Sequence, residues 1–388
     1  MNGRKILKHI RRWLAGATAA LFCLACTPAA QAEGVGGLSS LSAVLYEPES
    51  GRVLYEKDAH TPRPMASTTK LMTALIAMES CPPDLEIEVT AEAVRVEGSA
   101  LGLRAGDRIT MVDLVTGLLL ASGNDAANVI AYTVAGSIPA FAERMNERAA
   151  EIGMEDSVFV TPSGLDEGGH SSSAYDMALL AAEVLKNETL ASICGMKTAV
   201  IEFGNPPREV TVSNHNKLLR LYPYAIGMKT GFTKKSGRCL VSAARKDGAT
   251  LIAVTLNGGD YWNDHMALYN YGFTQVEAVP LALPALPDLP VAGGQTGAVA
   301  LSTPAPPVKT LLAGERDTLR TQIELPKFLF APVTAGEEVG RVRYFAGERE
   351  LCALPITTAE TTAARPVAGY GERFARILGE LLGEFLRL

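Results

Sequence analysis

Three short polar motifs in the chain could together perform nucleophilic catalysis. The first is Ser67-Thr68-Thr69-Lys70, at the start of a helix predicted over Met65–Ser80. Residues three positions apart share a helical face, so the lysine amine would lie one turn from the serine hydroxyl. Burial in this largely apolar helix disfavours the charged form of the amine. A neutral Lys70 could then accept the Ser67 proton and make the hydroxyl a usable nucleophile.

The second motif is Ser122-Gly123-Asn124, between the apolar run Leu118–Leu120 and a helix predicted from Ala126. A serine and an asparagine separated by glycine can point two polar side chains into one cleft. Ser122 would relay a proton between Lys70 and a leaving amine, and Asn124 would orient the substrate backbone and Lys70. An ordinary helix N-cap is the alternative interpretation of this motif.

The third motif is Lys229-Thr230-Gly231, on a strand predicted over Ile226–Phe232. A strand at the edge of a cleft can pair with an extended peptide. Gly231 would allow the substrate to approach closely, and Lys229 and Thr230 would bind its terminal carboxylate. Each motif alone occurs often by chance. Their occurrence together, in this order and on these elements, predicts one catalytic site.

The segments around the motifs predict an α+β domain over residues 38–276. Alternating runs at Ser42–Glu47 and Arg52–Lys57 flank a Pro-Glu-Ser-Gly turn and indicate a hairpin. Strands at both ends with helices between them favour an antiparallel sheet flanked by helices. Periodicity predicts helices over Met65–Ser80, Met111–Leu120, Ala126–Ala135, Ile138–Ile152, Ala174–Lys186 and Asp264–Phe273, and further strands over Ile226–Phe232, Cys239–Arg245 and Leu251–Asn257.

Three further segments follow this domain. Residues 277–294 contain four prolines and predict a stiff linker, and residues 295–358 predict a small β-rich domain. Residues 370–388 predict an amphipathic helix that lies on a membrane surface. The alternative is a helix packed on the β domain. In either case, the apolar stripe of the helix predicted over residues 370–388 consists of Phe374, Ile377, Leu378, Leu381, Leu382, Phe385 and Leu386.

The first 32 residues are typical of a secretory signal peptide. Five cations between Arg4 and Arg12 precede a short apolar run, Leu14–Cys26, and Ala30-Gln31-Ala32 offers a cleavage site. An uncleaved anchor and a lipoprotein signal at Cys26 are the alternatives. Removing residues 1–32 takes the formal net charge from −6 to −11. We therefore expect an exported protein at the extracytoplasmic face of the cytoplasmic membrane, with no nucleic acid partner.

Metal and cofactor chemistry find no support in the sequence. The cysteines after residue 32 are Cys81, Cys194, Cys239 and Cys352, which form no C-x-x-C pair and have no histidine at ligand spacing. Reduced thiols are favoured over a disulfide. We expect no metal site and no cofactor.

The motifs and their flanks resemble a known family. The matching stretches include Pro64-Met65-Ala66-Ser67-Thr68-Thr69-Lys70-Leu71-Met72-Thr73, Leu120-Ala121-Ser122-Gly123-Asn124-Asp125-Ala126-Ala127, Gly227-Met228-Lys229-Thr230-Gly231-Phe232-Thr233 and Asn214-His215-Asn216-Lys217-Leu218-Leu219. The chain is similar here to the low-molecular-weight penicillin-binding proteins, which are serine-type D-Ala-D-Ala carboxypeptidases of peptidase family S11. The resemblance covers roughly residues 40–275, and more weakly the β domain and terminal helix.

The resemblance implies a penicillin-binding-protein/β-lactamase-like fold and a role for each motif residue. Ser67 would be the acyl-ester nucleophile, Lys70 the base and Ser122 the proton shuttle, with the oxyanion hole formed by backbone N–H groups of Ser67 and Phe232. Asn124, Lys229, Thr230 and Gly231 would bind substrate. The implied reaction removes the terminal D-Ala from peptidoglycan stem pentapeptides, with β-lactam antibiotics as covalent inhibitors.

Two alternatives to this function are kept open. A class A-like β-lactamase would need a carboxylate that activates water, and Glu143-Arg144-Met145-Asn146 resembles such a signature superficially. We expect Glu143 to face solvent. A non-catalytic peptidoglycan-binding module would have no use for the Ser67–Lys70 pair.

Overall fold

The computed structural model describes residues 35–165, 168–366 and 369–385. The predicted signal peptide and its cleavage site lie outside the described residues. The chain forms two compact units. Unit 1 contains the chain up to Lys246 together with Thr250–Gln275, and unit 2 contains Asp247–Ala249 and the chain from Val276. All three sequence motifs belong to unit 1.

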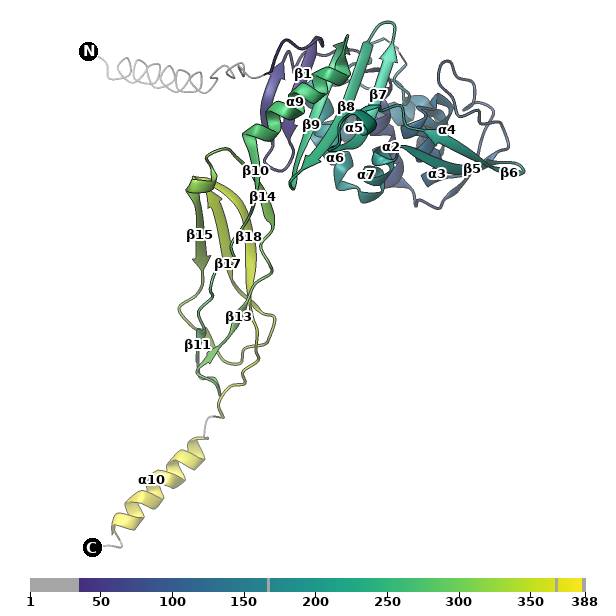
Figure 1. The fold of residues 1–388 in the computed structure, drawn as a ribbon. Helices are drawn as coiled ribbons and strands as arrows, with labels where there is room; N and C mark the ends of the chain where they lie inside the picture. The colour runs from purple at the N-terminus through teal and green to yellow at the C-terminus, as the bar shows by residue number, and fades with distance from the viewer. Residues whose placement is uncertain (1–34, 166–167, 367–368, 386–388) are drawn as a thin grey trace, which may run out of the picture. The chain divides into compact units, whose positions relative to one another are not determined.

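The centre of unit 1 is a five-stranded sheet (Figure 1). The pairs β1–β2, β1–β9 and β7–β8 are antiparallel. Every residue of β1 is buried, because helices cover the sheet and β1 lies inside it. The predicted hairpin and the three later strands are confirmed. In sheet order the strands are β2 (Arg52–Lys57), β1 (Ser42–Glu47), β9 (Ala249–Gly258), β8 (Gly237–Lys246) and β7 (Ala225–Thr233).

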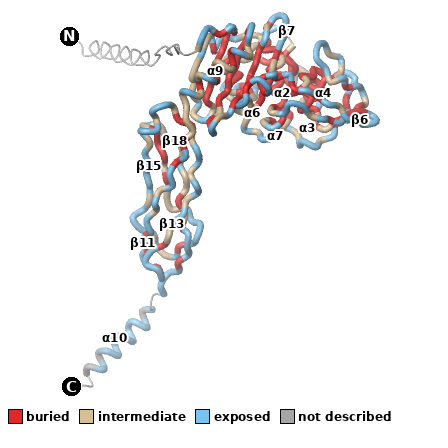
Figure 2. Tube along the Cα trace, viewed as in Figure 1, coloured by how far each residue is buried: buried red, intermediate tan, exposed pale blue. Residues whose placement is uncertain are grey.

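Helices pack around this sheet and enclose a large apolar core. Buried residues are red in Figure 2 and gather in this region. Side-chain caps mark where several helices begin. Each capping side chain accepts a hydrogen bond from a backbone N–H in the first turn of its helix, and the caps are Thr110, Ser137, Ser173 and Asn187. The predicted helices are confirmed, with small shifts at their ends, as η1 (Ala66–Thr69) with α2 (Lys70–Ser80), α3 (Met111–Leu120), α4 (Asn124–Ala135), α5 (Ile138–Ile152), α6 (Ala174–Lys186) and α9 (Tyr261–Gln275). Two short helices, α7 (Glu188–Gly195) and α8 (Leu218–Leu221), were not predicted.

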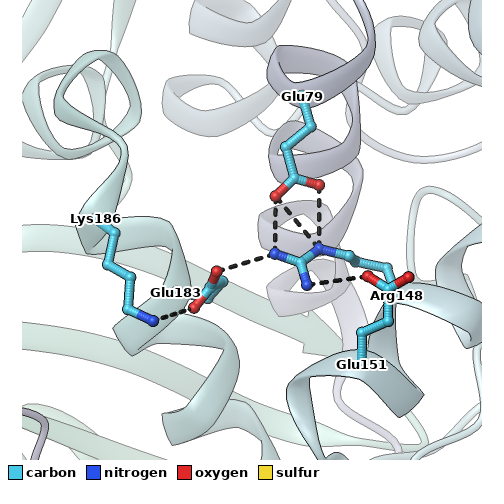
Figure 3. A network of polar contacts seen from close by, with 5 residues as sticks. All are labelled: Glu79, Arg148, Glu151, Glu183 and Lys186. Atoms are coloured by element: carbon cyan, nitrogen blue, oxygen red, sulfur yellow. Dashed lines mark hydrogen bonds and ion pairs between the residues drawn. The ribbon is translucent and has the colours of Figure 1, made fainter.

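A polar network centred on Arg148 of α5 joins three of these helices (Figure 3). Its guanidinium donates to Glu79 at the end of α2, with N–O distances of 2.9 and 3.1 Å, and to Glu183 of α6 at 2.9 Å. Glu151 of α5 and Lys186 of α6 extend the network. These contacts hold the far end of α2, the helix that begins with Lys70, against α5 and α6.

A second sheet of unit 1 was not predicted from the sequence. Its order is β3 (Glu86–Glu88), β4 (Arg108–Thr110), β5 (Thr198–Gly204) and β6 (Pro207–Ser213). The first two strands are only three residues long, too short for an alternating pattern to be visible. The last two form a hairpin through the Asn205-Pro206 turn.

Before α10, the regular structure of unit 2 consists of strands and one 3-10 turn, η2 (Arg316–Thr318), in agreement with the β-rich domain predicted for residues 295–358. A four-stranded sheet and a three-stranded sheet each enclose a small apolar cluster. The first has the order β13 (Leu301–Ser302), β18 (Arg349–Thr358), β17 (Glu338–Ala346) and β15 (Leu319–Glu324). The second is β12 (Ala298–Val299), β11 (Leu289–Ala292) and β16 (Leu329–Phe330), and β10 (Val276–Pro280) pairs with β14 (Val308–Leu312).

The prediction of a stiff linker over residues 277–294 was wrong. β10 and β11 lie largely within this range and belong to unit 2. The prolines misled the prediction because a proline lacks an N–H donor and usually interrupts a sheet. Here Pro280 ends β10, Pro284 and Pro287 lie between strands, and Pro290 lies on β11 opposite Ala298.

The predicted terminal helix is present as α10 (Tyr370–Phe385). Its apolar residues Phe374, Ile377, Leu378 and Leu382 are exposed (Figure 2). Within the described part of the chain, no helix is both long enough and apolar enough to cross a bilayer. The four cysteines of the described residues form no disulfide with one another, and Cys194 and Cys239 are buried.

Candidate active site

Ser67 and Lys70 lie at the junction of η1 and α2, in hydrogen-bond contact. The helix predicted from Met65 is divided: Ser67 belongs to a 3-10 turn, and Lys70 is the first residue of α2. The Lys70 Nζ atom lies 2.9 Å from Ser67 Oγ, 2.7 Å from Asn124 Oδ1 and 2.6 Å from the Ser163 carbonyl oxygen. The Asn124 and Ser163 oxygens can only accept hydrogen bonds. A neutral Lys70 amine therefore directs its two hydrogens to them and its lone pair toward the Ser67 hydroxyl.

The surroundings of Lys70 favour this neutral form. Its side chain is completely buried. Burial first, and then the positive charge of Lys229, hold the pKa of Lys70 well below its usual value, while Asp125 opposes them. The predicted burial of this amine is confirmed. The electrostatics thus supply a base beside a hydroxyl.

Asn124 and Ser122 of the second motif occupy different positions relative to Lys70. Asn124 begins α4, and its Nδ2 donates to the Glu97 carbonyl at 2.6 Å, which turns its Oδ1 toward Lys70. Ser122 is buried in the turn before α4. Among the described residues, its hydroxyl makes no hydrogen bond to Lys70 or Ser67. The direct contact between Asn124 and Lys70 supports the predicted orienting role of Asn124. The relay role of Ser122 stays a prediction.

The third motif lies on β7, the edge strand of the five-stranded sheet. Lys229 is buried, and its Nζ donates to the Thr230 carbonyl at 3.0 Å. Burial lowers the pKa of Lys229 to about 7. Phe232 is 65% exposed, and the predicted oxyanion role of its backbone N–H stays a prediction. As the last strand of its sheet, β7 offers the outer edge that pairing with an extended peptide requires.

Gly231 also has a structural role beyond the predicted approach of substrate, which stays a prediction. A Cβ there would lie 2.8 Å from the Met65 carbonyl oxygen and 3.0 Å from the Ser67 backbone nitrogen. The close approach is therefore between β7 and the turn that carries Ser67. This packing brings the third motif to the first.

Backbone strain is concentrated at the three motifs. Few non-glycine residues have positive φ in the described chain, and three of them are Ala66 (49°), Ser122 (61°) and Met228 (86°). These residues precede Ser67, begin the second motif and precede Lys229. Such conformations cost free energy and gather at functional sites. The strain accompanies the convergence of the three segments.

One part of the site was missed from the sequence: the segment around Pro162-Ser163-Gly164. The Ser163 carbonyl accepts from Lys70, and the Pro162 carbonyl accepts from Thr73 Oγ1 at 2.6 Å. A Cβ on Gly164, whose φ is 82°, would lie 2.0 Å from the Ala66 carbonyl oxygen. The Pro-Ser-Gly turn signal was visible, but a backbone carbonyl that acts as a ligand has no residue type to reveal it.

Together these contacts place a serine hydroxyl, a buried lysine amine and an edge strand with a second buried lysine close to one another, an arrangement that suits a serine-nucleophile enzyme. A family model described as D-alanyl-D-alanine carboxypeptidase matches residues 28–260, and one described as the C-terminal domain of penicillin-binding protein 5 matches residues 285–364. The chain therefore belongs to the D-alanyl-D-alanine carboxypeptidase family, peptidase family S11. It is a serine-type D-Ala-D-Ala carboxypeptidase with a penicillin-binding-protein fold.

Individual relatives agree with this assignment. The D-alanyl-D-alanine carboxypeptidase DacF of Bacillus subtilis is 30% identical over 331 residues, which cover 82% of this chain and 85% of the relative. The structure of DacD from Francisella tularensis matches with a TM-score of 0.61 at 26% identity, over 85% of this chain and 95% of that one. A carboxypeptidase structure from Mycobacterium tuberculosis matches with a TM-score of 0.60 at 30% identity, over 64% and 95%.

The structure does not support Glu143 as the water-activating carboxylate that the β-lactamase alternative requires. Glu143 on α5 is exposed, as expected. Its neighbour Asn146 has a structural role, because Oδ1 accepts from the Phe159 N–H at 2.8 Å and Nδ2 donates to the Phe159 carbonyl at 2.7 Å. The superficial signature at residues 143–146 therefore belongs to the scaffold.

Proposed function

We propose that the chain removes the terminal D-alanine from peptidoglycan stem pentapeptides through an acyl-enzyme on Ser67. The observation that carries this mechanism is the 2.9 Å contact between Lys70 Nζ and Ser67 Oγ, with the other two Nζ contacts made to oxygens that only accept. The buried amine with its lowered pKa is a base next to the nucleophile.

Acylation follows from this geometry. The Ser67 hydroxyl gives its proton to Lys70, and Oγ attacks the carbonyl carbon of the penultimate D-alanine. Backbone N–H groups of Ser67 and Phe232 stabilise the oxyanion. The peptide C–N bond then breaks, and the leaving amine takes a proton from Lys70 through Ser122. Free D-alanine departs and the shortened peptide stays as an ester on Ser67.

Substrate binding is assigned to β7 and Asn124. The peptide lies along the outer edge of β7, and its terminal carboxylate meets Lys229 and Thr230. Binding a carboxylate next to Lys229 favours the charged form of that amine. Water then attacks the ester, with Lys70 as the base, and regenerates Ser67. The strained four-membered amide of a β-lactam acylates Ser67 by the same first step.

Release of D-alanine from a muramyl pentapeptide tests the proposal. The purified protein should release one D-alanine per peptide, and Ser67→Ala should abolish release. Intact-mass analysis with penicillin should show one adduct on Ser67. A penicillin adduct without D-alanine release would contradict the assigned reaction, and the absence of any adduct would favour a non-catalytic binding module. Rapid hydrolysis of a chromogenic cephalosporin would favour the β-lactamase alternative.

The protein is further assigned to the outer face of the cytoplasmic membrane, after export and cleavage near residue 32. The basic and apolar N-terminal segment supports export. The exposed Phe374, Ile377, Leu378 and Leu382 of α10 support binding to the membrane surface. N-terminal mass analysis of the secreted protein tests cleavage. Ile377→Glu should reduce sedimentation with phospholipid vesicles, whereas Glu372→Ala on the same helix should not.

A further inference from the structure

Two neighbouring phenylalanines of unit 2 project into solvent. Phe328 is 46% exposed and Phe330 is 75% exposed, and their ring centroids lie 5.1 Å apart with the ring planes at 82°. Phe330 lies on β16, the edge strand of the three-stranded sheet, and Phe328 lies two residues before it. Alternate residues of an extended segment point to the same side, so the two rings form one apolar surface. We name Phe328 and Phe330 the aromatic pair.

The aromatic pair lies at the end of unit 2 from which the chain continues to α10. β16 pairs with β11 so that Phe330 is opposite Ala292. Gly293 and Gly294 follow Ala292 directly, and both bind Arg365, which precedes α10 in the chain. The Arg365 N–H donates to the Gly293 carbonyl at 2.8 Å, and Arg365 Nε donates to the Gly294 carbonyl at 2.6 Å. Figure 1 shows β11 at this end of the β domain.

The chain between this end and α10 is too short to separate them. Arg365 is fixed beside Gly293, and α10 begins at Tyr370. Five residue steps span at most about 18 Å even when fully extended. A helix lying in the headgroup region therefore keeps the aromatic pair close to the same lipid surface. Lys327, next to Phe328 in the chain, and Arg365, hydrogen-bonded to Gly293 and Gly294, are exposed cations at the same end of the domain.

We propose that the aromatic pair is a second lipid-contacting site, which inserts into the membrane surface next to α10. The inference rests on the proposed membrane binding of α10. Phenylalanine rings on a polar background suit the interface between headgroups and acyl chains, and the neighbouring cations suit anionic headgroups. Two contacts joined by a short segment reinforce each other, because the first raises the effective concentration of the second. The β domain is thereby held to the bilayer at two points.

A single tryptophan introduced at position 330 tests this site in the protein without residues 1–32, the predicted signal peptide, whose apolar run would itself bind lipid. Of the chain's two tryptophans, Trp13 is removed with that segment, and Trp262→Phe leaves a background without tryptophan fluorescence. Phe330→Trp on this background should shift its emission to the blue with phosphatidylcholine–phosphatidylglycerol vesicles, and lipids brominated in the acyl chains should quench it. Val308→Trp is the control. Val308 is also an exposed apolar residue, but it lies on β14, which pairs with β10 and not with β11, the strand beside the aromatic pair.

Sedimentation with the same vesicles measures affinity. The double variant Phe328→Ser/Phe330→Ser should bind about tenfold more weakly, since even partial burial of two phenylalanines contributes that much, while Val308→Ser should bind normally. If the Phe330→Trp protein sediments but its indole is not quenched, the second site is overturned and the α10 proposal stays intact. Failure of the unaltered protein to sediment would overturn both. A dimer in light scattering that the double variant abolishes would assign the aromatic pair to a second copy of the chain instead.

Discussion

Gly231 of β7 lies against the backbone of Ser67, so closely that an added Cβ would stand 3.0 Å from the Ser67 nitrogen. Contacts this short force one segment to move, and both of the nearest atoms, the Met65 carbonyl oxygen and the Ser67 nitrogen, belong to backbone. The strand that carries Lys229 and the turn that carries the nucleophile are therefore held in one arrangement by the absence of a side chain.

Gly231→Ala should slow acylation of Ser67 by about 100-fold, because displacement of a reacting group by about 1 Å has an effect of that size. The measurement is the rate of labelling by a fluorescent penicillin. Gly259→Ala is the matched control, since its Cβ would meet Ser39 at 3.8 Å, an ordinary contact. Equal labelling rates in the two variants would show that the close packing is not needed for catalysis.

Asn124→Asp should slow acylation at neutral pH and should lose less activity as the pH rises. The substitution puts a negative charge at the oxygen that lies 2.7 Å from Lys70 Nζ, which raises the pKa of Lys70. Each unit of increase lowers the fraction of neutral Lys70 about tenfold below that pKa, so a loss of roughly 10- to 100-fold is expected. Penicillin acylation rates across pH test the shift. A loss that is uniform across pH would instead indicate a role in binding alone.

Arg148→Gln should destabilise unit 1 by about 1–2 kcal/mol, because it removes charge-assisted hydrogen bonds to Glu79 and Glu183 and leaves these carboxylates close together. Chemical denaturation measures the loss, which should shrink at high salt. Arg144→Gln, an exposed arginine of the same helix, is the control. A pronounced fall in the penicillin acylation rate of folded Arg148→Gln would contradict the scaffold role given to this network.

Much of the site could be predicted because its chemistry requires particular side chains. A hydroxyl, a buried amine and a cationic strand need Ser67, Lys70 and Lys229, and these types at these spacings are visible in the sequence. The Ser163 carbonyl contributes as much to the Lys70 geometry as Asn124 does, yet any residue has such a carbonyl. The packing role of Gly231 was not predicted because the partner of its close approach lies far earlier in the chain, at residues 65–67.

In the fold too, elements with a clear local pattern were predicted, and elements that depend on distant partners were missed. Long helices follow clear periodicity, and the inner strands of the central sheet are apolar runs bounded by turn residues, so α5 and β9 were predicted well. β3 and β4 are three-residue strands that are stabilised by β5, far along the chain. β10 and β11 were mistaken for a linker because tertiary pairing overrode the local effect of proline. Elements defined by distant partners were the ones that local patterns missed.

Lys229→Met should abolish carboxypeptidase activity and yet stabilise the protein. Lys229 is buried, and burial lowers its pKa to about 7 from an ordinary value of 10.5. Between these two values the unfolded chain binds a proton that the folded protein does not, so the free energy of unfolding rises with pH across this window. The lysine therefore destabilises the fold most at and below about pH 7, and progressively less toward pH 10.5.

The stabilisation by Lys229→Met should accordingly be roughly 1–4 kcal/mol near pH 6 and should shrink as the pH rises from about 7 to about 10. Urea unfolding at several pH values provides the measurement. Lys234→Met in the same hairpin is the control, because Lys234 is exposed and its substitution should change stability little at any pH. If Lys229→Met were equally stabilising at both ends of this pH range, the gain would come from packing, and the charge on Lys229 would carry no cost in the folded protein. The expected result would mean that unit 1 gives up stability to keep a cation ready for a substrate carboxylate.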